Sequence, residues 1–287
     1  MTSGSPSSMR TWRPVRPELS RELTDARLQL HHAAQLVAAM GISYLPKQSD
    51  DSHTNLEWLD DAAALASHTI NDPTPIRLAV RPHPFALLFL REGEPRATLE
   101  LNGCTIERAI AWVRQQLAAA GVDAARYTNA KHYAIPPHAV AASASFSAAA
   151  SDAFEQLSFW YSNAALILGD IAARTPNSSP VRCWPHHFDI ATLIEVASPQ
   201  GNAPAKTTGV GMEPGDTYYD EPYFYVNMYP QPSAVPTMEL DGRGSWHARE
   251  WLGAVLPASQ VGSGDQHAQI DAFLRSAMQA CRAMLTA

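Results

Sequence analysis

Apolar side chains three and four residues apart recur in four long stretches of the chain, a spacing typical of amphipathic helices. These stretches cover residues 21–40, 106–120, 152–173 and 266–285. Residues suited to cap or stop a helix flank them: Ser20, Thr105, Ser151 and Asp265 before, and Gly41 and Gly121 after. A shorter helix is expected over residues 57–67. The pattern therefore predicts four main helices.

Segments with strand character lie between the helical stretches, in two groups interrupted by turns rich in Gly, Pro, Ser and Asn. The first group covers residues 76–81, 85–91 and 97–101, and the second covers residues 181–184, 188–196, 209–212 and 223–229. Short consecutive strands favour antiparallel pairing. We therefore expect an α+β protein whose antiparallel sheets are flanked by about four main helices.

The organisation of the chain follows from the order of these segments. Residues 1–18 are rich in Ser, Pro and Arg, which predicts a flexible N-terminal tail. Residues 19–135 and 136–287 each run from a helix through strands to a helix, and we expect the two lobes to pack as one globular unit. The letters PHPF at 82–85 are echoed by PHHF at 185–188. Either the chain holds two pseudo-repeated α-β-α lobes, or this short match arose by chance.

Composition narrows the classes of function. The chain has 287 residues, 46% of them hydrophobic, and a net charge of −7, with 21 Lys and Arg against 28 Asp and Glu. Without a basic face, nucleic acid is not an expected partner. No apolar run is long enough for a membrane span and no secretory signal is evident, so we expect a cytoplasmic protein that does not bind membranes. The three cysteines form no metal-binding or redox motif.

The strongest candidate for chemistry is the stretch Trp184-Pro185-His186-His187-Phe188-Asp189. If it forms part of a strand, His187 and Asp189 lie on one face, opposite Phe188, because side chains alternate along a strand. His187 is then a candidate metal ligand or general base that Asp189 orients, with Trp184 and His186 beside them. The alternative is a structural His–Asp hydrogen bond on a solvated face.

The strand predicted over residues 223–229 supplies a second set of polar groups. Alternation places Phe224 and the apolar residues in step with it on one face, and Tyr225, Asn227 and their neighbouring tyrosines on the other. If this strand joins the sheet of Asp189, the phenols and the amide flank the His/Asp pair and form a small-molecule pocket. The alternative is a sheet face covered by a helix, with tyrosines at its rim.

Other candidate ligand-binding residues are less strongly patterned. Glu213 lies in a glycine-containing acidic segment that matches no nucleotide-binding fingerprint, so a divalent cation is the one cofactor that remains under consideration. His53 stands in an Asp-rich loop, as part of an N-cap cluster or of a pocket. Trp246 and His247 form an aromatic anchor that either packs internally or lines a ligand site.

Two long blocks, SPVRCWPHHFDIATLIEV at 179–196 and GVGMEPGDTYYDEPYFYVNMYPQP at 209–232, resemble the signature blocks of an uncharacterised bacterial family with a domain of unknown function. The segments LHHAAQ, DDSHTNLEW and GAVLPAS are similar to further blocks of that family. Its more familiar branch has W-G-S-F-D where this chain has residues 185–189, so Phe188 and Asp189 are retained. The resemblance implies a site built from these blocks, and no particular activity.

Two functional hypotheses follow from these residues. The first is an enzyme acting on a small polar molecule through His187 and Asp189 beside the Tyr-rich strand, with or without a divalent metal. The second is a non-catalytic module that binds a small ligand or a protein through an aromatic surface made by Trp184, Tyr223, Tyr225 and Trp246. A purely structural role for all these side chains is the third interpretation.

Overall fold

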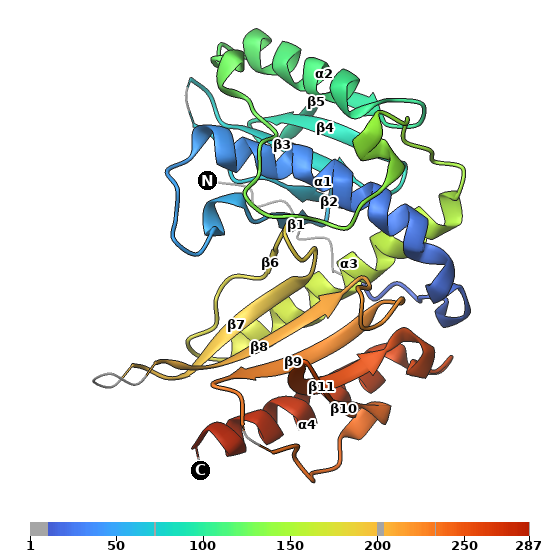
Figure 1. Cartoon of the computed structure of the whole chain (residues 1–287), viewed down its shortest axis with the longest axis vertical. Coiled ribbons are helices and arrows are strands. Elements are labelled where there is room, and N and C mark those ends of the chain that lie inside the picture. The colour runs from blue at the N-terminus through green and yellow to red at the C-terminus, as the bar shows by residue number, and fades with distance from the viewer. Residues whose placement is uncertain (1–10, 72, 200–203, 233, 287) are drawn as a thin grey trace, which may run out of the picture.

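Two helix–sheet–helix halves follow one another along the chain (Figure 1). The computed structural model describes residues 11–71, 73–199, 204–232 and 234–286. These residues form four α-helices and two antiparallel sheets, of five and six strands. The predicted α+β class is therefore confirmed.

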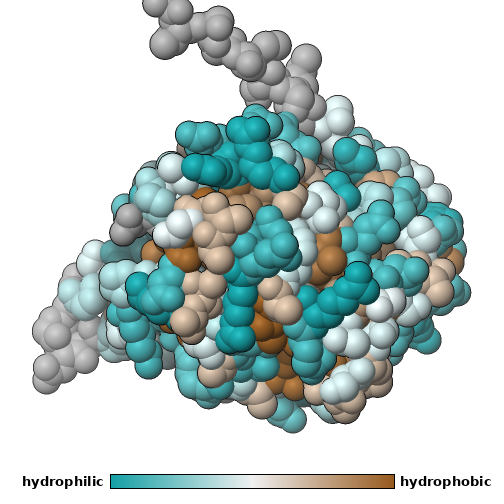
Figure 2. All heavy atoms as spheres, turned by 90° about the horizontal axis from the view of Figure 1, so that it is seen from above, coloured by the Kyte–Doolittle hydropathy of each residue, from teal (hydrophilic) through white to brown (hydrophobic). Residues whose placement is uncertain are grey.

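The first half is an antiparallel meander of five strands packed against two helices. Its strands pair in chain order, β1-β2-β3-β4-β5. Helix α1 packs over β3, and α2 packs along β5 with Ala109, Val113 and Leu117 buried. The opposite side of α2 faces the solvent at the end of the molecule that Figure 2 shows from above, where hydrophilic side chains predominate. The elements are α1 (Thr24–Tyr44), β1 (Glu57–Leu59), β2 (Ala64–Ala66), β3 (Ile76–Arg81), β4 (Ala86–Arg91), β5 (Glu94–Glu100) and α2 (Ile106–Ala119).

The second half has a six-stranded sheet in the order β10-β11-β9-β8-β7-β6. Helix α3 packs on β7 and β8, and α4 packs on β8 and β9, so that both helices contact the same sheet face. The core residues Phe224, Val226 and Met228 of β9 point to that face. The elements are α3 (Ser151–Arg174), β6 (Arg182–Cys183), β7 (Ile190–Ala197), β8 (Lys206–Glu213), β9 (Tyr223–Tyr229), β10 (Ser245–Arg249), β11 (Trp251–Pro257) and α4 (Gln266–Thr286).

Within the described chain, one pair of residues joins the two sheets by backbone hydrogen bonds. Leu56, just before β1, and Cys183 of β6 exchange two backbone N–H···O hydrogen bonds, each of 2.8 Å. One continuous hydrophobic cluster runs through both halves, from Leu30 and Leu78 to Ile190. The strand edges of the two halves therefore lie side by side above a shared core.

Helix α1 also contacts the second half. The ring of His31 stacks on Phe188, with centroids 4.5 Å apart. His31 Nε2 lies 2.8 Å from the carbonyl oxygen of Pro185, which also accepts a hydrogen bond from Gln35 Nε2 at 2.8 Å. The loop that follows β6 is thus held by buried side chains of the first half.

Most of the predicted helices are confirmed, with three differences at their ends. The first helix begins at Thr24 after a 3₁₀ turn, Pro17–Leu23, so Ser20 is not its cap. Gly41 does not stop it, because this glycine lies inside α1, where the backbone oxygen of His53 stands 2.0 Å from the position that a Cβ would take. Such a close approach excludes any side chain at position 41. The third helix already includes Ser151.

The segment at 57–67 was predicted as a short helix, and this is wrong. It forms the β1–β2 hairpin, in which Glu57 pairs with Ala66 and Leu59 with Ala64. Strands β10 and β11 were not predicted at all. The echoed letters at 82–85 and 185–188 both fall in turns between neighbouring antiparallel strands, β3–β4 and β6–β7.

Part of the predicted N-terminal tail is fixed. Residues 1–10 lie outside the described residues, but Val15 is buried. Its N–H donates to Gln266 Oε1 at 3.0 Å, and Gln266 Nε2 donates back to its carbonyl at 2.9 Å. Residues 11–18 are therefore anchored to the start of α4. No helix among the described residues is both long and apolar enough to span a membrane.

Candidate functional site

The Tyr-rich strand β9 belongs to the same sheet as β7, which begins directly after Asp189, so the condition set for a shared site is met. In β9, Tyr225 and Asn227 point away from α3 and α4, on the face that also carries Gly211 and Gly209 of β8. The phenol of Tyr225 lies flat over Gly211: a Cβ there would come within 2.6 Å of the phenol oxygen. The ring can therefore extend across β8 toward the start of β7.

Asp189 is the group that Tyr225 reaches. The phenol donates to Asp189 Oδ2 at 2.5 Å, while Asp189 Oδ1 is buried and has no partner among the described residues. Burial raises the pKa of the Asp189 carboxyl, and the hydrogen bond from Tyr225 and the nearby His187 oppose that rise. The two side chains therefore form a buried hydrogen bond between a phenol and a carboxyl.

A second buried carboxyl, Glu213, stands at the end of β8 next to this pair. Burial raises its pKa well above the usual range, the negative charges of Asp189 and Asp216 raise it further, and Arg27 opposes them. Its Oε1 also lacks a partner within the described chain. Two neighbouring buried carboxyls do not both ionise readily. A proton kept on one of them supplies the donor that the unpartnered oxygens lack.

This proton has a measurable consequence for stability. A carboxyl whose pKa is raised by folding contributes stability that is present below its unfolded pKa and is lost as pH rises through its folded pKa. Glu213→Gln cannot titrate and so does not show this loss. We therefore expect the unfolding free energy of the variant, relative to that of the wild type, to increase as the pH is raised from 4 to 8. Urea unfolding across this range measures it.

The matched control for Glu213→Gln is Glu239→Gln, at an exposed position. The unfolding free energy of the control should differ from that of the wild type by the same amount at every pH in the range. Equal pH profiles for Glu213→Gln and the wild type would contradict a raised pKa at Glu213.

The histidine motif is a hairpin loop between β6 and β7, so the predicted strand alternation through it is wrong. Phe188 has φ = 76°, in the left-handed region, and the loop is closed by the Trp184 N–H donating to the Asp189 carbonyl at 2.8 Å. This turn leaves His187 exposed and Asp189 buried. His186 is half-buried against the rings of His187 and Tyr133. The centroid of the Trp184 ring lies 5.9 Å from that of His186.

The remaining predicted residues are divided between places. Asn227 Oδ1 accepts from Gly209 N at 3.2 Å, and His247 stacks on Trp251 and lies 2.9 Å from the Tyr219 hydroxyl through Nδ1. Both are on the face of Tyr225. His53 lies in a separate 3₁₀ turn, Ser52–Thr54, and accepts from Gln48 N.

Trp246 points to the opposite face of β10 from His247 and donates to the Met238 carbonyl. Tyr223 is buried, with its hydroxyl on Asp216 at 2.7 Å. The four aromatic residues of the predicted recognition surface therefore do not form one exposed patch. Within the described ranges, no group of three or more His, Cys, Asp or Glu side chains is arranged to hold a metal ion.

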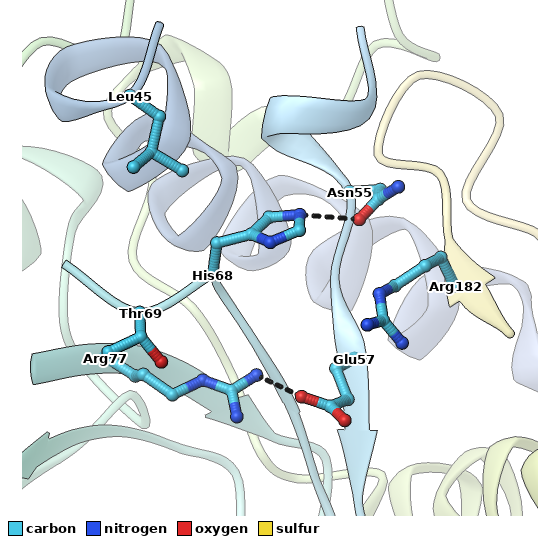
Figure 3. A pocket seen from close by; sticks show the side chains of 7 residues that line it. All are labelled: Leu45, Asn55, Glu57, His68, Thr69, Arg77 and Arg182. Atoms are coloured by element: carbon cyan, nitrogen blue, oxygen red, sulfur yellow. Dashed lines mark hydrogen bonds and ion pairs between the residues drawn. The ribbon is translucent and has the colours of Figure 1, made fainter. Parts of the chain in front are cut away.

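A polar cavity of about 400 Å³, which no sequence pattern indicated, lies at the junction of the two sheets (Figure 3). Its walls come from β3, the ends of β1 and β2, and β6. We call it the arginine pocket, and it is lined by Leu45, Asn55, Glu57, His68, Thr69, Arg77 and Arg182. Its volume is in the range of small-molecule sites.

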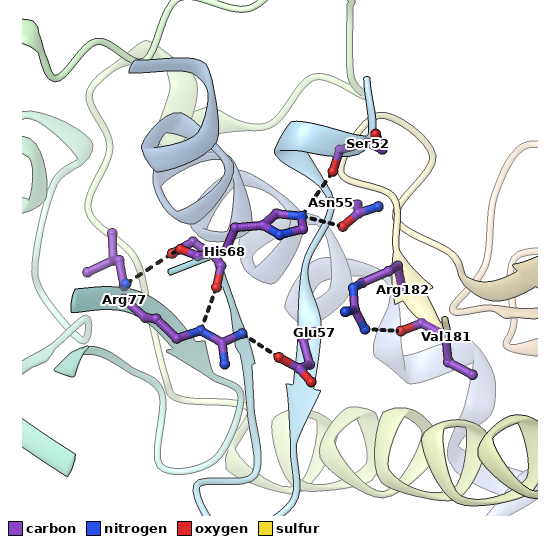
Figure 4. Close-up of polar contacts among 9 residues, drawn as sticks. Ser52, Asn55, Glu57, His68, Arg77, Val181 and Arg182 are labelled. Carbon is purple, nitrogen blue, oxygen red and sulfur yellow. Dashed lines mark hydrogen bonds and ion pairs between the residues drawn. The ribbon is translucent and has the colours of Figure 1, made fainter. Parts of the chain in front are cut away.

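His68 is held in one tautomer on the wall of this pocket. Its Nε2 lies 3.0 Å from the Ser52 carbonyl and 2.8 Å from Asn55 Oδ1 (Figure 4). Both partners are acceptors, so Nε2 carries the proton and Nδ1 keeps a lone pair, which faces the pocket (Figure 3). Burial lowers the pKa of His68, and the positive charges of Arg182 and Arg77 lower it further, against the Ser52 hydrogen bond. The imidazole is therefore neutral at pH 7.

The two arginines of the pocket differ in what they already bind. Arg77 donates through Nε to the Ser67 carbonyl at 2.6 Å and pairs through Nη2 with Glu57 Oε2 at 2.7 Å. Arg182 donates through Nη1 to the carbonyl of Val181 at 2.8 Å. Its other N–H groups make no further hydrogen bond within the described chain, so Arg182 is the cation available to a ligand.

Comparison with known proteins places the chain in a family and gives no activity. The model of DUF5996, a family of unknown function, matches residues 17–286, and the chain belongs to this family. No curated protein and no solved structure matches it significantly. The resemblance expected from the sequence blocks is thereby confirmed.

Proposed function

We propose that this protein is an enzyme that acts on a small organic anion in the arginine pocket. Arg182 binds the anionic group, and His68 is the general base. The observation that carries the proposal is the fixed tautomer of His68, whose unprotonated Nδ1 faces a cavity that also holds the Arg182 guanidinium, bonded only through Nη1 to the Val181 carbonyl among the described residues. The sequence hypothesis also expected a small-molecule substrate, but it placed the reaction at His187 and Asp189. The proposal places the reaction at His68 and Arg182 instead.

Charge favours an anion as the ligand. The pocket is lined by two arginines and one glutamate, and Glu57 is paired with Arg77. The charge left over is that of Arg182, which stands next to Glu57 in the antiparallel register set by the Leu56–Cys183 bridge. A guanidinium with free N–H groups suits a carboxylate or a phosphate, which it binds through two parallel hydrogen bonds.

His68 fits the role of a base better than the residues first suggested. A general base must be unprotonated at the working pH and must reach the proton that it removes. His68 meets the first condition because its pKa is lowered, and the second because Nδ1 borders the cavity. Asp189 is buried and already bonded to Tyr225, so a substrate reaches it only after a rearrangement.

Binding is tested with malonate and inorganic phosphate as probes, by calorimetric titration. Loss of a charge-assisted hydrogen-bonding partner costs about 1.5–3 kcal/mol. Arg182→Met should therefore lower the affinity for whichever of the two probes binds more tightly by at least about tenfold. Arg108→Met, at an exposed position of α2, is the control and should bind as the wild type does. The proposal fails if neither probe binds, or if Arg182→Met binds as tightly as the wild type.

Catalysis is tested separately from binding. We expect the wild type to speed the incorporation of deuterium from solvent at the methylene carbon of bound malonate, followed by NMR. His68→Gln keeps a donor for the Ser52 carbonyl but has no basic nitrogen, so it should bind malonate and lose the exchange. Binding without exchange in the wild type would refute the enzyme and leave a ligand-binding module, which is the alternative from the sequence.

A further inference from the structure

We infer a second ligand site, for a free organic acid with an extended apolar body, in the groove between α3 and α4. This groove lies on the helix-covered face of the six-stranded sheet, away from the arginine pocket. It has a volume of about 400 Å³. Its lining is Arg174, Thr175, Pro176, Ile194, Val196, Thr208, Met278, Gln279 and Arg282.

The floor and walls of the groove are largely apolar. Ile194 and Val196 of β7 come from one side, and Met278 of α4 comes from the other. A neighbouring hollow of about 370 Å³ shares Arg174, Thr175 and Met278 with it and continues the apolar lining to Ile171. The groove therefore offers an elongated surface for a hydrocarbon chain rather than a compact polar cavity.

The mouth of the groove carries uncompensated positive charge. Arg174 ends α3 and Arg282 lies in the last turns of α4, and no acidic residue lines the groove. Neither guanidinium has a hydrogen bond or an ion pair within the described part of the chain. In the adjoining hollow, by contrast, Arg275 is already paired with Asp271. An anionic head group on an apolar body matches this distribution of charge.

An independent observation points to a ligand in the same groove. Thr208 lines the groove, and its side-chain oxygen is buried and has no hydrogen-bond partner among the described residues. A buried hydroxyl without a partner is costly, so such groups are normally satisfied. A rotation of Thr208 about its Cα–Cβ bond would turn this hydroxyl toward the groove, where the carboxylate of a ligand would supply the missing partner.

The proposal is tested with octanoate, acetate and octan-1-ol as probes, by calorimetric titration of the full chain. Each methylene that leaves water strengthens binding by about two- to fourfold, so octanoate should bind at least about tenfold more tightly than acetate. The double variant Arg174→Gln, Arg282→Gln should lose at least about tenfold in affinity for octanoate and little for octan-1-ol. Both arginines are exposed, so the variant is expected to fold as the wild type does.

Thr208→Val keeps the shape of the side chain and removes its hydroxyl. We expect it to weaken octanoate about two- to tenfold, since the carboxylate is the only polar group of this probe. Arg182→Met should leave the tighter octanoate site intact and remove only weak carboxylate binding in the arginine pocket, which separates the two sites.

Three outcomes would overturn the proposal. The first is equal affinity for acetate and octanoate, which indicates ion pairing alone. The second is unchanged octanoate binding in the double arginine variant. The third is binding to vesicles of phosphatidylglycerol and phosphatidylcholine without binding of free octanoate, which assigns the groove to membrane acyl chains instead.

Discussion

Acidification from pH 8 to pH 4.5 should cost this protein about 2–3 kcal/mol of unfolding free energy through His31 alone. Burial is the main cause that lowers the pKa of His31 to about 4, against the hydrogen bond to Pro185. A histidine depressed in this way contributes stability that is present above its unfolded pKa, near 6.5, and lost as pH falls toward its folded pKa. The loss is large because a protonated imidazole would be buried at the contact between α1 and the loop after β6.

His31→Gln isolates this contribution. The amide can still donate to the Pro185 carbonyl but does not titrate, and it loses the stack on Phe188. We expect the variant to be less stable than the wild type at pH 8 by about 1 kcal/mol, and the difference to close or reverse at pH 4.5. Urea unfolding at both pH values measures the difference in unfolding free energy between the wild type and the variant. His83→Gln, at a partly exposed position, is the control, and a gap for His31→Gln that does not change with pH would contradict the prediction.

Gly211→Ala should destabilise the protein by about 3 kcal/mol, although it adds a single methyl group. The new Cβ would stand 2.6 Å from both Cζ and the hydroxyl oxygen of Tyr225. The ring must move, its hydrogen bond to Asp189 breaks, and the buried carboxyl is left without a donor. Gly264→Ala is the control, because nothing lies within 4 Å of a Cβ at that position.

The cause of this cost can be separated from a general effect on the strand. In a Tyr225→Ala background the phenol is absent, so Gly211→Ala should cost much less than in the wild type. Such a difference is the coupling energy of a double-mutant cycle, which is large for residues in direct contact. An equal cost in both backgrounds would show that the ring of Tyr225 is not what position 211 must accommodate.

Local pattern was enough to predict elements in which the tertiary packing agrees with the alternation or periodicity of the segment itself. Residues 76–81 and 223–229 form the strands that their alternation indicates, and Thr105 caps α2 by accepting from Arg108 N. The pattern failed where tertiary contacts decide. Gly41 reads as a helix stop, but it serves a close approach of another segment. The 57–67 segment has helix-like apolar spacing, yet sheet pairing with β3 makes it a hairpin.

The candidate sites show the same division. The pairing of Tyr225 with Asp189 was within reach of the sequence, because both lie at or next to strands of one antiparallel group. The arginine pocket was not, because His68 and Arg182 are distant along the chain and carry no shared motif. Their proximity depends on how the two halves pack, and in particular on the backbone bonds between Leu56 and Cys183, which no periodicity encodes. His187 was misplaced because the left-handed Phe188 reverses the chain there.

Because the arginine pocket lies between the two halves, its occupancy is tied to the free energy with which the halves pack together. His68, Glu57 and Arg77 belong to the first half and Arg182 to the second, so the complete binding surface exists only while the halves are docked. By thermodynamic linkage, an anion held by both sides must strengthen their association by the same factor by which docking strengthens its own binding. A ligand of the arginine pocket would thus act as a clamp between the two halves.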